Sequence, residues 1–200
     1  MYRTQGGTPG TSGAGCETTT GIRRARSADP DDIRDFFAGL STRTRYLRFF
    51  APITPTAAML RYLSGRGPSQ VDALIAVRDG VIVGHAMASD QAGPRGELTT
   101  DIGVVVADAC QRQGVGAALI RALVSRAQAR GVAVLTMDVL HGNTDVLGMI
   151  MSHWPRARAT RTDDGVAMQV RLPQHRPRRA ATGPRRTGQR VKAPWPSART

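Results

Sequence analysis

Apolar residues between positions 20 and 173 follow two different periods, which predict where strands and helices lie. Short apolar runs rich in Val and Ile, bounded by turn-forming residues, are typical of strands. Asp79-Gly80 separates two such runs and predicts a tight hairpin, because Gly accepts the positive φ of a type I′ turn. A further hairpin is expected at Asp163-Asp164-Gly165. The predicted strands are Ile22–Arg26, Val71–Val77, Val81–Ala88, Glu97–Val106, Val132–Val139, Ala157–Thr162 and Val166–Leu172.

Five other segments carry helix signals. Asp29-Pro30-Asp31-Asp32 places a capping residue, a Pro at the first helical position and acidic residues in the first turn, so a helix should run from there to about Leu40. Apolar residues of the segment before Gly131 fall on one helical face, and Gly131 is a typical stop. The other predicted helices are Ser41–Phe50, Pro55–Leu63, Val115–Arg130 and Asn143–His153.

The alternation of these elements predicts an α/β layer fold with one clear strand–helix–strand crossover, between residues 97 and 139. Two hundred residues suit one domain with tails, which we expect to span residues 21–173. Residues 1–20 are rich in Gly, Thr and Ser without periodicity and should form a disordered leader. Residues 174–200 carry Pro, Gly and Arg and should form a disordered basic tail.

The formal net charge of +13 is concentrated in that tail, which holds eight basic residues and no acidic ones. Such a segment attracts nucleic acid, an acidic partner or anionic lipid without reading sequence. Trp195 is its only aromatic residue, so base stacking has little support. The simpler interpretation, a solvated low-complexity end, is favoured over a weak contact of this kind.

Other features narrow the setting. The two cysteines, Cys16 and Cys110, are too few for a disulfide framework and favour a reducing compartment. The amino terminus has no apolar signal region, and no apolar run is long enough to span a membrane, so a cytoplasmic location is expected. The histidines and cysteines show no metal-ligand spacing, and no metal site is predicted.

The most informative segment joins the strand that ends at Val104-Val105-Val106 to the helix that begins at Val115. Backbone N–H groups at a helix amino terminus lack intrahelical partners and attract anions, and Gly114 and Gly116 let a diphosphate approach closely. A P-loop is excluded because the chain has no lysine before Lys192. A dinucleotide-binding fingerprint fits poorly because Leu119 stands where a third Gly is needed, although Asp138 has the spacing of a ribose-binding acid. A plain glycine-containing turn is the remaining alternative.

Gln111, Gly114 and Gly116 resemble the Gln/Arg-x-x-Gly-x-Gly/Ala signature of the GNAT family of N-acetyltransferases, and the order of strands and helices is similar over residues 20–173. The resemblance implies a mixed, mostly antiparallel sheet of six to seven strands, flanked by helices and splayed to form an acyl-CoA cleft. It implies acetyl-CoA as the co-substrate. It also implies that Asn143 contacts the pantetheine arm, beside the alternative of an ordinary helix cap. The residues implied to hold acetyl-CoA are Val104, Val105, Val106, Gln111, Arg112, Gln113, Gly114, Val115, Gly116, Ala117 and Asn143.

A second segment, Leu40 to Phe50, resembles the Leu-Ser-x-x-Ser-x-Tyr-x-Arg-Phe-Phe pattern of bacterial protein lysine acetyltransferases that act on acyl-CoA synthetases, with Thr44 in place of the second Ser. This resemblance implies a protein lysine as the acceptor. A small-molecule amine remains an alternative, and so does a non-catalytic module that binds acyl-CoA. Several apolar residues of the segment could also simply be helix core.

Transfer to an amine requires a base, because a lysine side chain is protonated at neutral pH. Similar enzymes carry a Glu five residues before the last apolar residue of the central strand, and Asp101 stands there in this chain, with Glu97 as the second candidate. The backbone N–H of Val104 is expected to meet the oxyanion. Many relatives use a Tyr in the last helix to protonate the thiolate, and this chain has none there.

Overall fold

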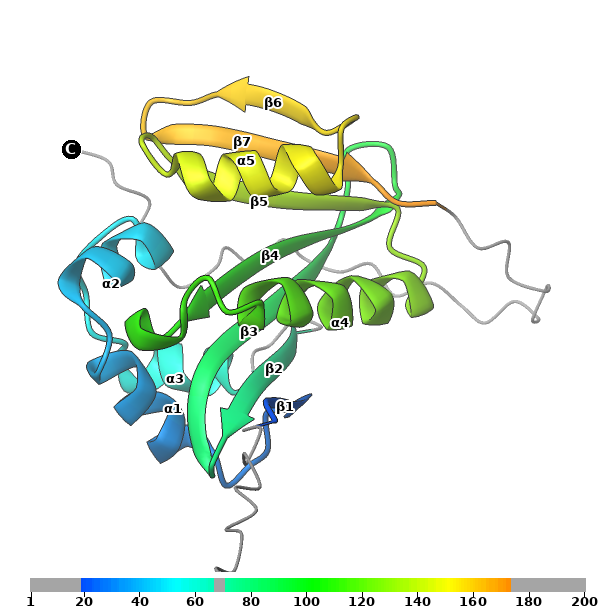
Figure 1. The fold of residues 1–200 in the computed structure, drawn as a ribbon. Coiled ribbons are helices and arrows are strands. Elements are labelled where there is room, and N and C mark those ends of the chain that lie inside the picture. Colours follow the sequence, from blue (N-terminus) through cyan, green and yellow to red (C-terminus); the bar gives the residue numbers. More distant parts are fainter. Residues whose placement is uncertain (1–18, 67–70, 174–200) are drawn as a thin grey trace, which may run out of the picture.

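The computed structural model describes residues 19–66 and 71–173 (Figure 1). The disordered leader predicted for residues 1–20, apart from Thr19 and Thr20, and the basic tail predicted for residues 174–200 fall outside these residues. The elements follow one another as β1 (Gly21–Arg24), α1 (Pro30–Ala38), α2 (Thr42–Phe49), α3 (Ala57–Leu63), β2 (Val71–Arg78), β3 (Val81–Ala92), β4 (Leu98–Val106), the 3-10 turn η1 (Asp108–Cys110), α4 (Val115–Ala129), β5 (Val134–Leu140), α5 (Thr144–His153), β6 (Arg158–Arg161) and β7 (Gly165–Arg171).

The seven strands form one sheet in the order β1-β2-β3-β4-β5-β7-β6. Neighbouring strands are antiparallel except β4 and β5, which are parallel because α4 carries the chain back across the sheet. The predicted α/β class with a mixed, mostly antiparallel sheet is therefore confirmed. Strand β3 continues four residues beyond the predicted end, to Ala92, because Ser89–Ala92 pair with Leu98–Asp101 despite their broken apolar pattern. The hairpin between β2 and β3 has positive φ at both Asp79 (51°) and Gly80 (78°), as a type I′ turn requires.

Helices cover both faces of the central strands β2, β3 and β4, whose alternate residues divide between the two layers. Leu119 and Leu123 of α4 and Ile150 of α5 pack with one set of strand residues, including Leu135. The helices α1, α2 and α3 pack on the opposite face, around Phe37. Figure 1 shows α4 and α5 in front of the sheet and α3 behind it. Among the described residues, no helix is long and apolar enough to cross a bilayer.

The capping role predicted for Asp29 is wrong. Asp29 occupies the position before α1, and Pro30 begins the helix as expected, but the Asp29 side chain makes no capping hydrogen bond. Its carboxylate instead accepts two hydrogen bonds from the Arg23 guanidinium, at 2.7 and 2.9 Å, and one from the backbone N–H of Arg26. The Asp29 carboxylate therefore binds a charged side chain on β1 and not the N–H groups of the helix terminus. In contrast, Ser41 caps α2, since its Oγ accepts a hydrogen bond from Thr44 N at 3.1 Å.

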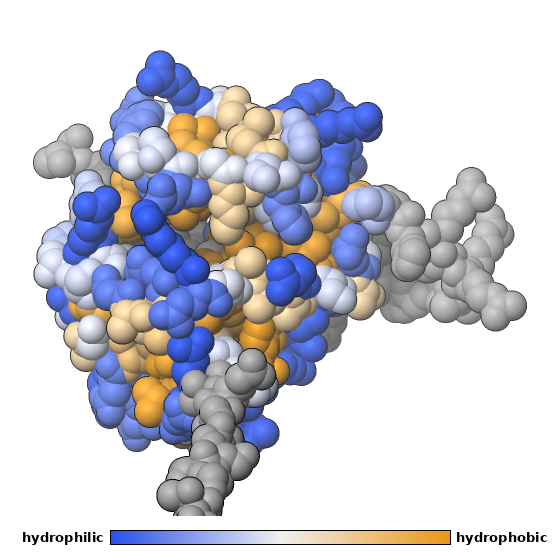
Figure 2. Space-filling model, in the orientation of Figure 1, coloured by the Kyte–Doolittle hydropathy of each residue, from blue (hydrophilic) through white to orange (hydrophobic). Residues whose placement is uncertain are grey.

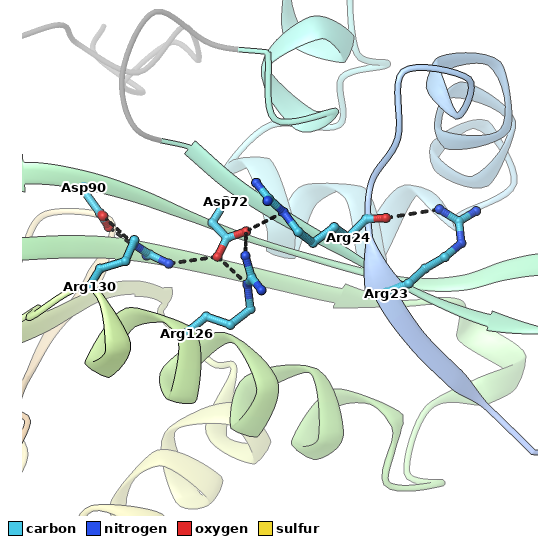
Figure 3. A network of polar contacts seen from close by, with 6 residues as sticks. All are labelled: Arg23, Arg24, Asp72, Asp90, Arg126 and Arg130. Carbon is cyan, nitrogen blue, oxygen red and sulfur yellow. Dashed lines mark hydrogen bonds and ion pairs between the residues drawn. The ribbon is translucent and has the colours of Figure 1, made fainter.

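A cluster of charged side chains fixes the carboxyl end of α4 to the sheet (Figure 3). Arg126 binds the carboxylate of Asp72 on β2 through two hydrogen bonds of 2.6 and 3.0 Å. Arg130 binds Asp90 on β3 in the same bidentate manner and also reaches Asp72 at 2.8 Å. Because both carboxylates are buried, these pairs hold α4 in one position along the sheet.

Candidate active site

Strands β4 and β5 separate halfway along their length. Their register pairs run only from Thr99 and Val134 to Asp101 and Thr136. Beyond Asp101, β4 continues to Val106 paired with β3 alone. The edge of β4 that faces β5 therefore offers backbone groups to a ligand, in the manner of a strand that accepts an extended chain. This is the splayed arrangement expected from the sequence.

The side chains of Val104, Val105 and Val106 do not share one environment. Val105 is buried in the layer of α1, α2 and α3, whereas Val104 and Val106 pack partly against the α4 and α5 layer. Contacts from this stretch to a ligand in the opening must therefore come chiefly from the backbone, as the sequence predicted for a pantetheine arm.

The loop after β4 ends in a left-handed turn that starts α4. Gly114 stands before the first helical residue with φ of 81°, and Arg112 also has a positive φ of 60°. As in any first helical turn, the N–H groups of Val115, Gly116 and Ala117 lack intrahelical partners. No side chain caps α4 in their place. A Cβ built on Gly114 would meet no heavy atom within 4 Å. The helix terminus is therefore open to an anion, and its dipole favours one.

The long side chains of this loop mainly hold its shape. Gln111 donates to the Val106 carbonyl oxygen at 3.1 Å and to Thr44 Oγ1 at 3.3 Å. Gln113 donates to the Ala109 carbonyl oxygen at 2.8 Å. Arg112 is exposed and pairs at 2.7 Å with Asp145 in the first turn of α5. The backbone N–H of Gln111 is also engaged, since it donates to the Asp108 carbonyl oxygen at 3.4 Å.

Asp108 ties α2 to the same loop. Its carboxylate accepts from Ser41 N at 2.9 Å, from Ser41 Oγ at 2.7 Å and from Thr44 Oγ1 at 2.7 Å. Burial alone would raise the pKa of Asp108, but these hydrogen bonds outweigh it and hold the pKa below its usual range. The Ser and Thr of the sequence segment that begins at Leu40 thus have a structural role that the sequence did not reveal.

An apolar strip lies between α4 and α5, the two helices that flank the opening. A small pocket there is lined by Ala117, Ile120, Met149, His153 and Trp154. Figure 2 shows hydrophobic surface in the band between these helices. At the amino end of α5, Asn143 makes no side-chain capping hydrogen bond, so the alternative of an ordinary cap is not supported. Asn143 precedes the amino end of α5 and is not among the residues that line the strip.

Asp101 lies where β4 and β5 begin to separate. It is partly buried, and Thr136 Oγ1 on β5 approaches its carboxylate at 3.4 Å. Burial and the negative charge of Asp138 raise the pKa of Asp101 to about 6 from 3.8, against the opposing effects of Arg48 and the Thr136 contact. Asp101 is thus mostly ionised at neutral pH, although its pKa lies closer to 7 than the pKa of an ordinary Asp does.

Glu97, the second candidate for the base, lies away from this point. It precedes β4 by one residue and accepts a hydrogen bond from the backbone N–H of Arg95 at 3.0 Å within the turn between β3 and β4. Asp101 lies four positions further along the chain, which corresponds to roughly 13 Å in a strand. The structure therefore does not bring Glu97 to the opening between the strands.

Arg48 and Tyr62 are near Asp101 and were not predicted as site residues. Tyr62, from α3, is 5% exposed and donates to Ser89 Oγ at 2.7 Å, and Ser89 is the strand partner of Asp101. Burial raises the pKa of Tyr62, and the charge of Asp101 adds to that rise. In the sequence Arg48 is only the Arg of a family pattern, and nothing in the local sequence of Tyr62 distinguishes it from helix core.

The histidines and cysteines of the described residues form no metal site. His85 is fully buried on β3, and burial lowers its pKa to about 4. The neutral ring donates from Nε2 to the Leu63 carbonyl oxygen at 2.8 Å. His85 is therefore a structural residue that links β3 to α3.

A family model described as the Acetyltransferase (GNAT) family matches residues 40–151, which include the opening, the loop and the first turn of α4. The chain belongs to this family. It is therefore an acetyl-CoA-dependent N-acetyltransferase, in agreement with a helix terminus open to a diphosphate beside a splayed strand. A search of curated proteins gave no match.

Solved GNAT structures share the fold. The GNAT domain of S. lividans PAT superposes with a TM-score of 0.68 at 21% identity, covering 76% of this chain and 90% of that one. The putative acetyltransferase yncA of Salmonella typhimurium, solved with acetyl-CoA, gives 0.62 at 20% identity, with coverage of 82% and 99%. A phosphinothricin acetyltransferase of Sinorhizobium meliloti, also with acetyl-CoA, gives 0.60 at 18%, with coverage of 82% and 95%. At these identities the likeness concerns the fold alone.

Proposed function

We propose that this GNAT chain acetylates lysine side chains of proteins and that Asp101 is the base of the reaction. The observation that carries the proposal is the position of Asp101 at the point where β4 and β5 separate, with its pKa raised to about 6. A perturbed carboxylate beside a cofactor opening is a good candidate for a proton acceptor.

The chemistry follows from this position. Asp101 accepts a proton from the lysine ammonium group, directly or through one water. The neutral nitrogen then attacks the thioester carbonyl carbon of acetyl-CoA, the C–N bond forms and the C–S bond breaks. The excess proton on the new C–N nitrogen passes to the departing thiolate, which leaves as the coenzyme A thiol, and Asp101 returns its own proton to solvent. A base with a pKa near 6 is ionised at pH 7 and accepts the proton more readily than one near 4. A backbone N–H of β4, which we assign to Val104, would stabilise the oxyanion.

Acetyl-CoA would occupy the opening with its diphosphate at the first turn of α4. The N–H groups from Arg112 to Ala117 would bind the phosphate oxygens, and the free edge of β4 at Val104–Val106 would bind the pantetheine amides. Asn143 and the apolar strip between α4 and α5 would contact the rest of the arm. The exposed Arg112 would add positive charge near the phosphates.

The surface beside Asp101, where the acceptor amine would bind, favours a protein acceptor over a small molecule. Thr136 and Asp138 of β5 share a sheet face with Gln169 of β7, its strand neighbour, on the side opposite α5. Asp138 and Gln169 are exposed, as are Arg158 and Thr160 of the neighbouring β6. This open, polar strand face next to Asp101 suits a polypeptide segment lying across it. An enclosed pocket would be expected for a small amine.

The segment from Leu40 to Phe50 resembles lysine acetyltransferases that act on acyl-CoA synthetases. Acyl-CoA synthetases are therefore the first protein substrates to test. Purified acyl-CoA synthetases and a panel of small primary amines should be compared by release of the coenzyme A thiol, with acetylated lysines mapped by mass spectrometry. We expect transfer to a synthetase lysine with higher kcat/KM than to any amine of the panel. Turnover of small amines without protein acetylation would contradict the proposed acceptor but not the assignment of Asp101.

A further inference from the structure

Arg48 extends from α2 to the sheet face that carries Asp101. A Cβ built on Gly103 would lie 2.5 Å from Arg48 Nη2 and 2.6 Å from Cζ, so the guanidinium occupies the space that any side chain at 103 would need. The Arg48 Cζ atom also lies 5.2 Å from the ring centre of Phe49, which is buried. The guanidinium is therefore held in a slot that depends on glycine at position 103.

This slot places a positive charge beside the base. Residues two apart on a strand point to the same face, so the guanidinium above Gly103 lies next to Asp101. Burial lowers the pKa of Arg48, and the negative charge of Asp101 is the larger of the two effects that oppose the fall. The interaction is therefore mutual, since Arg48 in turn lowers the pKa of Asp101.

The other groups that face Asp101 either raise its pKa or carry no charge. Asp138, two residues beyond Thr136 on β5, adds a negative charge. Tyr62 from α3 is neutral at physiological pH, because the ordinary pKa of a tyrosine is about 10 and burial raises it further. Ser89 on β3 and Thr136 on β5 are neutral hydroxyls. Among these groups of the described residues, Arg48 supplies the positive charge.

We infer that Arg48 is a positioning residue, seated over Gly103, that keeps the Asp101 carboxylate ionised at neutral pH so that it can act as the base. The inference rests on the proposed role of Asp101. Arg48 acts through Asp101 and does not contact the reacting atoms. Because the positive charge of Arg48 lowers the pKa of Asp101, loss of that charge would raise the pKa and reduce the fraction of Asp101 that is ionised at pH 7.

The test compares the pH dependence of kcat/KM for the wild type with three variants at this contact. Arg48→Met removes the charge, Gly103→Ala displaces it without changing Arg48, and Arg48→Lys retains it. Arg43→Met, an exposed arginine of the same helix, is the matched control. We expect the acid limb near pH 6 to move up by about one unit or more in Arg48→Met and Gly103→Ala. Arg48→Lys should show a smaller shift, and the control should not move.

Direct titration of the Asp101 carboxyl by carbon NMR in the same proteins gives a readout that does not require turnover. A higher carboxyl pKa in both Arg48→Met and Gly103→Ala supports the inference. An unchanged carboxyl pKa and acid limb in folded Gly103→Ala and Arg48→Met overturn it. If Asp101→Asn loses turnover but the two variants leave the carboxyl pKa unchanged, only the inference about Arg48 fails. If Asp101→Asn keeps wild-type turnover, the proposed base fails and the inference fails with it.

Discussion

At the scale of single residues, the site depends on a carboxylate that is kept partly out of water. Asp101 is charged at neutral pH although burial and Asp138 both disfavour that charge. Such a group lowers the stability of the fold, and in the proposed mechanism it accepts the proton of the acceptor amine. Functional carboxylates can be recognised by this conflict, since a purely structural Asp would have partners that lower its pKa, as Asp29 has.

Asp101→Asn should therefore stabilise the folded protein above pH 6. The folded-state pKa is about 6 and the ordinary value is 3.8, so the folded state binds the proton more tightly and loses stability as pH rises from about 4 to 6. Two pKa units correspond to roughly 3 kcal/mol, which is an upper limit for the gain. Urea unfolding at pH 5 and pH 8 measures it.

The gain should be larger at pH 8 than at pH 5, and Asp163→Asn in the exposed turn before β7 should show neither gain. A loss of stability at pH 8 in Asp101→Asn would mean that the carboxylate is held by favourable contacts, in conflict with its assigned state.

At the scale of elements, α4 connects the cofactor loop to a rigid anchor. Its amino end carries the open N–H groups after Gly114, and its carboxyl end is bound by Asp72 and Asp90 through Arg126 and Arg130. The two ends lie roughly 22 Å apart along the helix. The two ends can therefore be tested separately, the first by ligand affinity and the second by stability.

Gly114→Asp should abolish measurable binding of acetyl-CoA, because it places a negative charge at the proposed diphosphate site and a side chain on a backbone with φ of 81°. Gly131→Asp is the matched control. Gly131 also has a positive φ, of 82°, and open space around its Cβ position, but it follows the other end of α4. Calorimetry with acetyl-CoA should show lost affinity in the first variant alone. Equal affinities in both variants would remove the loop from the cofactor site.

Asp72→Asn should destabilise the fold by about 2–4 kcal/mol, because Arg126 and Arg130 lose a shared, buried partner while keeping some access to solvent. Its affinity for acetyl-CoA should stay unchanged. Asp31→Asn removes one partner of the exposed Arg34–Asp31 pair and should cost less than about 1 kcal/mol. Chemical denaturation provides both values, and similar small losses in the two variants would show that the Asp72 cluster is not an anchor.

At the scale of the whole molecule, local sequence predicted the sheet well and the active site only in part. Hydrophobic periodicity and turn chemistry located the strands and the Val115 helix start, because these depend on near neighbours. The surroundings of Asp101 come instead from α2, α3, β3 and β5. Arg48 and Tyr62 meet Asp101 only because the chain folds, so no local pattern could place them there. Asp29 does not cap α1 because its carboxylate binds Arg23 on β1, a contact that the helix signals around Asp29 do not indicate.

The most direct test of Asp101 as the base is the pH dependence of acetyl transfer in the wild type and in Asp101→Asn, at saturating acetyl-CoA with one lysine-containing acceptor protein. The wild type should gain kcat/KM through an acid limb near pH 6. Asp101→Asn should lose turnover by about 10²-fold or more and lose that limb, with its affinity for acetyl-CoA unchanged. A variant that keeps both the rate and the limb would contradict the account.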